Sequence, residues 1–213
     1  MKQILFDLDG TLTDSGEGII RCAQETLSHL GLPVPTKEAL RVIVGPPLRQ
    51  SFLRFGIRPE DIDKAVEIYR QHYVAHGKFE NFPYPGIEQL LQRLKNDGHH
   101  LYVATSKPET MSIEILEHFG LAKYFDIICG ASPDRSRDTK AKVIQHLLTQ
   151  ISPIPGKIIM VGDTVYDVEG ANELQIPAIG VSWGYGIVDD MRQAGAMGIA
   201  DSMDQLYQQI TQY

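Results

Sequence analysis

The stretch ILFDLDGTLTDS, residues 4–15, carries the pattern that decides the fold. An apolar run ends in two carboxylates, Asp7 and Asp9, and Gly10 and Thr11 follow at once. Side chains two positions apart on a strand point to the same face, so an extended run would turn both carboxylates toward one place. A buried carboxylate is costly unless a cation or hydrogen-bond donors meet it. The stretch therefore predicts a cation beside the two aspartates or, because Asp-Gly is a strong hairpin signal, a simple turn.

Further apolar, β-rich runs alternate with helical patterns from residue 84 onward. Runs of this kind, apolar enough to be buried on both faces and separated by helices, are typical of a parallel sheet. The predicted strands are residues 3–8, 100–105, 125–131, 157–163 and 178–183. The sequence therefore predicts an α/β fold, with a Rossmann-like parallel sheet and helices on both of its faces.

Residues 15–83 interrupt this alternation, because they contain several helical patterns and no convincing strand. Pro83 and Pro85 then mark a linker that returns to the alternating pattern. We therefore expect two domains, a core made of residues 1–14 and 84–213 and an inserted all-α cap made of residues 15–83.

Composition restricts the class of protein. The 213 residues are 43% hydrophobic and 22% charged, with 20 basic against 27 acidic residues and a formal charge of -7. No basic cluster with interleaved aromatics stands out, so a nucleic-acid polymer is not an expected partner. No apolar run is long enough for a signal peptide or a membrane span. Cys22 and Cys129 lack a CxxC partner and are expected to be buried free thiols, which agrees with a cytoplasmic protein.

Three later segments place polar residues at predicted strand ends. Thr105 and Ser106 follow one strand and would suit an anion, although hydroxyls there also cap helices. Lys140 begins a predicted helix, where a cation opposes the helix dipole unless an anion lies nearby; the alternative is a solvated surface lysine. Asp163 and Asp167 follow another strand and would suit Mg²⁺ or, alternatively, helix capping.

Each segment lies at the carboxyl end of a different predicted parallel strand, and such ends meet at one edge of a sheet. We therefore expect one shared site there, in which a divalent cation allows the two carboxylates of the opening stretch to coexist.

With these residues in view, the chain resembles the haloacid dehalogenase superfamily, and within it the phosphatases of the phosphoglycolate phosphatase-like and 5'-nucleotidase-like branches that carry a helical cap. The residues that carry the resemblance are Asp7-Leu8-Asp9-Gly10-Thr11, Thr105, Lys140, and Gly162-Asp163 with Asp167. The resemblance covers essentially the whole chain. It implies an enzyme that hydrolyses small phosphate monoesters.

The resemblance also implies roles for single residues. Asp7 would be the nucleophile that forms an aspartyl-phosphate, and Asp9 the general acid and then the base. Mg²⁺ would be held by Asp7, the backbone carbonyl of Asp9 and Asp163, with Asp167 as a further ligand or a support. Thr105 and Lys140 would stabilise the phosphoryl group, with Lys142 as the alternative lysine. Phosphate or substrate contacts are expected from Gly10, Thr11, Ser106 and Lys107, and from Gly45 and Arg49 in the cap.

Several functions remain open at this stage. Asp9 favours phosphoryl transfer over dehalogenation, because a halide leaving group needs no proton. The segments VATSKP (103–108) and GPPL (45–48) resemble the 5'-nucleotidase-like branch and favour nucleoside 5'-monophosphates as substrates. The alternatives are a phosphoglycolate phosphatase, a sugar phosphomutase, and a non-enzymatic module that only accepts a phosphoryl group on Asp7. No membrane partner is expected, and a monomer is compatible with the sequence.

Overall fold

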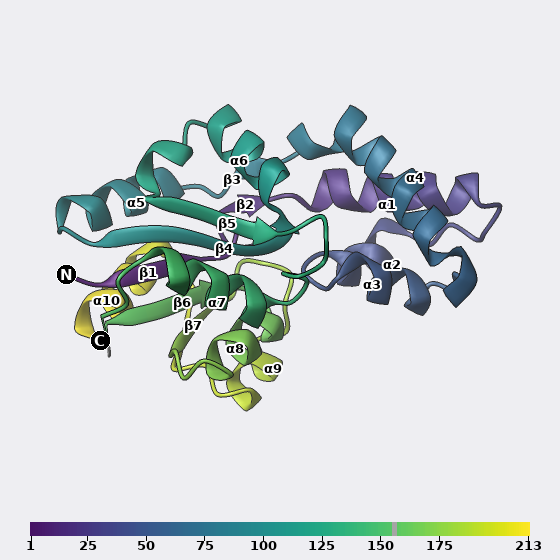
Figure 1. Cartoon of the computed structure of the whole chain (residues 1–213). Helices are drawn as coiled ribbons and strands as arrows, with labels where there is room; N and C mark the ends of the chain where they lie inside the picture. The colour runs from purple at the N-terminus through teal and green to yellow at the C-terminus, as the bar shows by residue number, and fades with distance from the viewer. Residues whose placement is uncertain (155–156) are drawn as a thin grey trace.

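A central parallel sheet organises the computed structural model, which describes residues 1–154 and 157–213. In these residues six strands pair in the order β5-β4-β1-β6-β7-β8, all parallel (Figure 1). Their bounds are β1 Gln3–Phe6, β4 His100–Pro108, β5 Ile127–Ala131, β6 Ile158–Gly162, β7 Ala178–Val181 and β8 Gly198–Ala200. The predicted α/β fold is confirmed, and the five predicted strands are present. The edge strand β8 was not predicted.

Helices cover both faces of the sheet, because alternate residues of each buried strand point to opposite sides. In β1, Ile4 and Phe6 join one apolar cluster and Leu5 joins another, and all three are fully buried. The first cluster includes side chains from α5 (Ile87–Asn96), α6 (Glu109–His118) and α10 (Met203–Gln212). The second includes side chains from α7 (Lys140–Gln150), α8 (Val165–Asn172) and α9 (Val188–Gln193). Each large side chain buried in this way contributes about 1.5–3 kcal/mol.

A helical insertion, Gly16–Phe79, separates the first strand from the rest of the sheet and lies to its right in Figure 1. Its helices are α1 (Gly16–His29), α2 (Lys37–Leu40), α3 (Leu48–Arg54) and α4 (Ile62–Ala75), with short 3₁₀ turns η1 (Arg41–Ile43), η2 (Pro59–Asp61) and η3 (Gly77–Phe79). Leu27 of α1, Phe52 of α3 and Tyr69 of α4 belong to one buried cluster. The insertion thus has an apolar core of its own.

The chain enters and leaves the insertion through a small ribbon that we call the neck. Strand β2 (Thr13–Asp14) pairs antiparallel with β3 (Phe82–Pro83), at residues that the sequence did not predict as strands. Between β1 and β2 the chain makes a tight turn, in which Gly10 N donates to the carbonyl of Thr13 at 2.8 Å. Because β2 pairs with β3 in the two-stranded sheet, the opening stretch is not a hairpin.

Two simpler expectations concern the helices and the cysteines. Among the described residues, every helix is too short or too polar to cross a bilayer. Cys22 and Cys129 are both buried, and both are free thiols.

Candidate active site

The candidate site lies where β1 and β6 end side by side. Asp7 directly follows β1, and its backbone N–H donates to the carbonyl of Val161 in β6 at 2.9 Å. Asp163 directly follows β6. After β1 the chain adds strands on one side of the sheet, and from β6 onward on the other, so this edge is the topological switch point where open α/β sheets bind ligands.

Three carboxylates meet at this edge, and we call Asp7, Asp163 and Asp167 the acidic cluster. One oxygen from each lies within 4.8 Å of the others, and all three residues are buried. These oxygens are the kind of donor that a hard divalent cation such as Mg²⁺ takes from a protein. The donor set therefore fits the cation that the sequence predicts.

The side chain of Lys140 is the cation that the structure itself places in the acidic cluster. Its Nζ lies 2.7 Å from Oδ1 of Asp7 and 2.7 Å from Oδ1 of Asp167, and it donates to the carbonyl of Ala104 at 2.8 Å. Lys140 is the first residue of α7, so these two carboxylates are the anions that offset its unfavourable place at a helix N-terminus. Lys142 is exposed and pairs with a surface aspartate instead.

Burial and charge shift the pKa values in the cluster. Burial raises the pKa of Asp7 to about 6, although Lys140 opposes the shift. Burial also raises the pKa of Asp163 well above its ordinary value, and the neighbouring Asp167 and Asp7 add to the shift. Burial alone would lower the pKa of Lys140, but Asp167 and Asp7 raise it instead. When the three carboxyl groups are ionised, their charge exceeds that of the one ammonium group. A divalent cation would offset this excess of negative charge.

The surroundings of Asp163 are shaped by backbone that comes very close. Its Oδ2 accepts a hydrogen bond from the backbone N–H of Tyr185 at 2.8 Å, and its Oδ1 accepts one from the hydroxyl of Thr11 at 3.4 Å. A Cβ atom at Gly10 would lie 2.1 Å from Oδ2, and one at Gly184 would lie 2.3 Å from it. Glycine at both positions therefore keeps the space around this carboxylate open.

Asp167 has a structural task as well as a place in the cluster. Its Oδ2 accepts from both the backbone N–H and the hydroxyl of Thr164, at 3.0 and 2.9 Å. The first of these bonds and the reciprocal one from the backbone N–H of Asp167 to the Thr164 side chain form a capping box at the start of α8. A Cβ at Gly162 would lie 2.2 Å from the Asp167 carboxyl carbon. Asp167 therefore caps α8, as one reading of the sequence predicts, while its Oδ1 contacts Lys140 in the acidic cluster.

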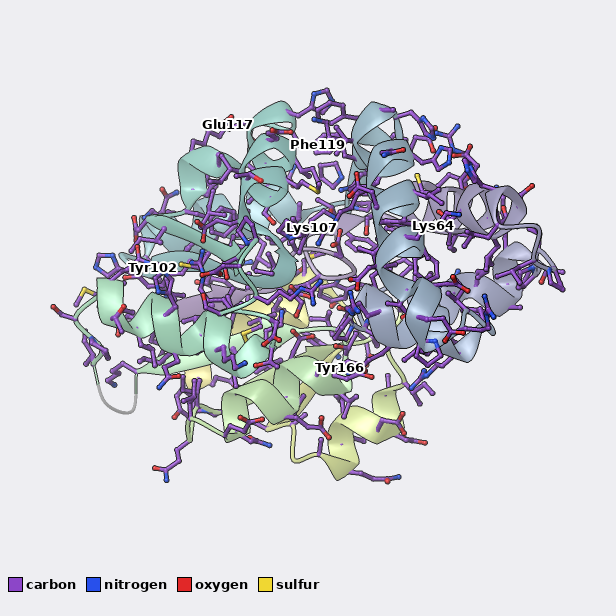
Figure 2. All side chains as sticks on the ribbon, turned by 45° about the vertical axis from the view of Figure 1, so that its right-hand side comes forward. Lys64, Tyr102, Lys107, Glu117, Phe119 and Tyr166 are labelled. Atoms are coloured by element: carbon purple, nitrogen blue, oxygen red, sulfur yellow. The ribbon has the colours of Figure 1, made fainter. Side chains whose placement is uncertain are left out.

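Asp9 has a different environment from Asp7. Its two oxygens lie 3.0 and 2.8 Å from Nζ of Lys107, a pair that is mostly but not fully buried. The same Nζ lies 4.7 Å from the centre of the Tyr73 ring in the insertion. Figure 2 shows Lys107 where the core meets the insertion helices. Asp9 is therefore held on the side of the site that faces the insertion.

The residues of the VATSKP segment lie within β4 and not at a helix cap. The hydroxyl of Thr105, which is buried, accepts from the backbone N–H of Lys107 at 3.2 Å, and Ser106 is half-buried. The pairing of β4 with β5 is irregular between Ala104 and Pro108. Helix α6 begins after Pro108, with no side-chain cap. The capping alternative for the two hydroxyls is thus not what the structure shows.

The two predicted residues of the insertion lie in different places. Gly45, with a φ of +101°, approaches the core so closely that a Cβ there would lie 2.7 Å from Cγ2 of Thr164. Arg49 forms an ion pair with Asp63, and Arg135 of the core contacts the same carboxylate at 3.1 Å. The structure therefore brings Gly45 next to the start of α8, the helix that carries Asp167. Arg49 has its partner within the insertion.

Sequence reasoning missed the part that Tyr185 plays. This residue donates its backbone N–H to Asp163, and its ring hydroxyl accepts from the backbone N–H of Gly16 at 2.9 Å and contacts Asp14. A usable signal was present, because Gly184 and Gly186 flank it just after a strand. Those glycines permit a close backbone approach to Asp163.

Comparisons with known proteins agree with this geometry. A sequence model of the haloacid dehalogenase-like hydrolase family matches residues 4–181. The chain is 43% identical over 186 residues to the tyrosine-protein kinase PtkA of Mycobacterium tuberculosis. The matched residues cover 87% of this chain. It spans 64% of that relative's length, just under two thirds. A 5'-nucleotidase of Pseudomonas aeruginosa is 40% identical over 190 residues, which cover 89% of this chain and 86% of that protein.

This chain is also similar to solved structures. The crystal structure of a predicted phosphatase from Clostridium acetobutylicum superimposes with a TM-score of 0.95 at 43% identity. The superposition covers 100% of this chain and 99% of that one. The similarity therefore includes the helical insertion as well as the sheet.

Proposed function

The chain belongs to the haloacid dehalogenase-like hydrolase family, and from this premise we propose that it is a Mg²⁺-dependent phosphomonoesterase that works through an aspartyl-phosphate on Asp7. The observation that carries the proposal is the convergence of Asp7, Asp163, Asp167 and Lys140 at one edge of the sheet. The proposed substrates are small phosphorylated metabolites. We also propose that residues 15–83 act as a cap domain on a core of residues 1–14 and 84–213, and that the protein is cytoplasmic.

Asp7 is the proposed nucleophile. Uncatalysed hydrolysis of phosphate monoesters is extremely slow, and a covalent intermediate divides one difficult step into two easier ones. A carboxylate oxygen of Asp7 attacks phosphorus, a new P–O bond forms, and the bond from phosphorus to the ester oxygen breaks. Lys140, 2.7 Å from Oδ1 of Asp7, keeps the carboxylate oriented and adds positive charge beside the transferring group.

Asp9 is the proposed general acid and base. It gives a proton to the departing ester oxygen, and it then takes a proton from the water that attacks phosphorus and releases Asp7. Lys107 holds both oxygens of Asp9 at 2.8–3.0 Å, on the side of the site that faces the insertion. The leaving group would therefore lie toward the insertion, which supports a part for the insertion in substrate choice.

The acidic cluster is the proposed metal site. Asp7, Asp163 and the backbone carbonyl of Asp9 would hold Mg²⁺, and Asp167 would support the site through Lys140 and α8. When bound, the cation would offset the charge of the carboxylates and of the phosphoryl oxygens. The hydroxyls of Thr105, Thr11 and Ser106 and the backbone at Gly10 would contact the phosphoryl group, while Gly45 would border the substrate space.

The insertion is proposed to close over the site and exclude water. Contacts between Tyr73 and Lys107, and between Gly45 and Thr164, support this arrangement because they join the insertion to the site on two sides. Arg49 remains a candidate for a substrate anion, provided that it leaves Asp63 when a substrate binds.

The experiment that tests the proposed function measures phosphate release from p-nitrophenyl phosphate with and without Mg²⁺. We expect multiple turnovers in the presence of Mg²⁺, loss of turnover in Asp7→Asn, and trapping of a phosphorylated protein in Asp9→Asn. Full activity of Asp7→Asn would contradict the proposal. A single turnover that stops at phosphorylated Asp7 would favour the phospho-accepting module, and sugar phosphate isomerisation without phosphate release would favour a phosphomutase.

Substrate choice needs a separate comparison of kcat/KM. We propose nucleoside 5'-monophosphates as the leading substrates, on the segments VATSKP and GPPL and on the similarity to a protein named 5'-nucleotidase. The comparison also includes 2-phosphoglycolate, hexose phosphates and, because one relative is named a tyrosine-protein kinase, a tyrosine phosphopeptide. A lead of about tenfold for 2-phosphoglycolate would replace the proposed substrate by that of a phosphoglycolate phosphatase.

A further inference from the structure

A second group of metal-binding side chains lies inside the helical insertion. Cys22 and Glu25 are three positions apart on α1, and His72 and His76 are four positions apart on α4 and at its C-cap. Such spacings place side chains on one face of a helix. Side chains of α1 and α4 pack in one apolar cluster, so these two faces meet.

The donor atoms are already close to one another. Oε2 of Glu25 lies 2.9 Å from Nε2 of His76 and 3.2 Å from Nδ1 of His72. A ligand atom of Cys22, Glu25 and His76 each lies within 4.8 Å of the other two. Tetrahedral Zn²⁺, with bonds of about 2.0–2.3 Å, separates its donor atoms by about 3.3–3.7 Å. The histidine nitrogens, 2.9 and 3.2 Å from Oε2 of Glu25, are near that separation.

The chemistry of these donors differs from that of the acidic cluster. Thiolate and imidazole select Zn²⁺ and similar metals, whereas Mg²⁺ prefers oxygen. One carboxylate and one thiolate would balance a divalent charge. Arg21 is the nearest competing cation, with Nε 3.9 Å from Oε1 of Glu25, but its guanidinium pairs with Glu80 at 2.7 Å. The local charge therefore does not oppose a bound metal.

The group is buried on one side and open on the other. Cys22 is fully buried. The side chains of Glu25, His72 and His76 are each about a third exposed. A shallow, open hollow of about 550 Å³ on the surface is lined in part by Glu25 and His72. A cation can therefore arrive from solvent at a site with a buried sulfur behind it.

We propose that Cys22, Glu25 and His76, with His72 beside Glu25, form a Zn²⁺-type site that joins α1 to α4 in the insertion. The site is separate from the proposed catalytic metal in its donors and in the elements that carry it. Bound metal would fasten the two longest helices of the insertion to each other and stabilise them. The competing explanation is a hydrogen-bonded clasp, in which Glu25 accepts from two histidines and no metal binds.

The test titrates this chain with Co²⁺, as a coloured substitute for Zn²⁺, in saturating Mg²⁺ that is added to fill the proposed site at the acidic cluster. We expect one equivalent of Co²⁺ to give the strong visible bands of tetrahedral cobalt and a thiolate-to-cobalt charge-transfer band. Cys22→Ser should remove the charge-transfer band, and His76→Ala should weaken binding by at least about tenfold. His146→Ala, at an exposed histidine on α7, is the matched control and should bind like the unaltered chain.

Thermal unfolding gives a second measurement. Zn²⁺ should raise the Tm of the unaltered chain and of His146→Ala by several degrees, and should raise that of Glu25→Gln much less. Glu25→Gln keeps the size of the side chain and an acceptor oxygen, so it tests the site even if His76→Ala fails to fold. Absence of the charge-transfer band, or an equal Zn²⁺ effect on Glu25→Gln and the unaltered chain, would overturn the proposal and leave the clasp.

Discussion

Gly10 combines two requirements that glycine alone meets. Its φ of +84° is a conformation that side chains rarely adopt, and a Cβ there would lie 2.1 Å from Oδ2 of Asp163. Gly56 has the same φ of +84°, but nothing lies within 4 Å of the place where its Cβ would be. A comparison of substitutions at the two positions therefore separates the effect of backbone strain from that of a steric conflict with the acidic cluster.

We predict different results for alanine at these two positions. Gly56→Ala should cost about 1–2 kcal/mol of stability from the left-handed backbone and leave kcat/KM nearly unchanged. Gly10→Ala should cost more, and should lower kcat/KM by about a hundredfold or more because Asp163 must move. Urea unfolding and phosphate release from p-nitrophenyl phosphate measure the two effects. Equal activities in the two variants would contradict the account of Gly10.

Lys107 allows a second prediction for a single residue. Its ammonium holds both oxygens of Asp9, so Lys107→Met should leave this carboxylate free to rotate and lower kcat/KM by about ten- to a hundredfold. Lys142→Met is the control, because Lys142 is an exposed lysine that pairs only with a surface aspartate among the described residues. Steady-state kinetics on the same substrate compares them. If both variants lose activity equally, the loss comes from overall charge and not from Asp9.

The residues that meet at the sheet edge were predictable where the side chain itself lies in the acidic cluster. The prediction that Asp7, Asp163 and Asp167 meet followed from their places at strand ends, and the structure places them together. Tyr185 was not found, because it reaches Asp163 through a backbone N–H, which every residue except proline carries. The partner of Arg49 was not found either, because an ion pair across two helices depends on packing.

One loop links the acidic cluster to the first helix of the insertion. The backbone of Tyr185, after β7, donates to Asp163, and its hydroxyl accepts from Gly16 N at the start of α1. The guanidinium of Arg41 lies 5.2 Å from the centre of the same ring. A displacement of this loop would therefore reach both the cluster and the insertion.

Tyr185→Phe should loosen the insertion without disturbing Asp163, because the backbone N–H remains. We predict a severalfold increase in KM, and faster amide hydrogen exchange in the first turn of α1, with a smaller change in kcat. Tyr207→Phe removes a surface hydroxyl that donates to Asp97 at 2.7 Å and is the matched control. Unchanged exchange in α1 of Tyr185→Phe would contradict this role of the loop.

The strands that the sequence did not predict are short. Strands β2 and β3 have two residues each and β8 has three, which is too short for an alternating pattern to be recognised. The longer core strands, of four residues or more, were found. The neck in particular depends on two segments that are distant in the sequence and pair only in the folded chain.

At the scale of the whole molecule, the acidic cluster opposes folding when no cation is bound. The pKa of Asp163 is raised chiefly by burial, so its protonated form favours the folded state. The contribution of this carboxyl to stability is therefore complete below its unfolded pKa of about 3.9 and is lost as the pH rises through the raised value. Asparagine at this position imitates the protonated form at every pH.

Asp163→Asn should therefore be more stable than the unaltered chain in metal-free buffer containing EDTA. We predict a higher Tm for the variant at pH 8 and a smaller difference at pH 5, with about 2–4 °C for each kcal/mol at this chain length. Added Mg²⁺ should raise the Tm of the unaltered chain and have little effect on the variant. Scanning calorimetry in matched buffers measures both. A variant that is less stable than the unaltered chain at pH 8 without metal would show that the cluster does not oppose folding.

The division of the chain into a sheet and a helical insertion was visible in the sequence, because the alternation of strand and helix stops at residue 15 and resumes near residue 84. How the insertion rests on the sheet edge was not visible. That arrangement depends on close contacts such as Gly45 with Thr164 and Tyr73 with Lys107, which no periodicity encodes.

The neck makes the insertion exchangeable. Because Thr13 pairs with Pro83 and Asp14 with Phe82, the two cut points lie on adjacent strands, about 5 Å apart. A short turn between them would close the core without disturbing the order of the sheet, and the insertion of a relative could be grafted at the same two points. The contacts between insertion and core would have to be matched, among them those made by Lys107, Tyr185 and Arg135. Under the proposed role of the insertion, recombination at the neck would change substrate choice and leave the acidic cluster as it is.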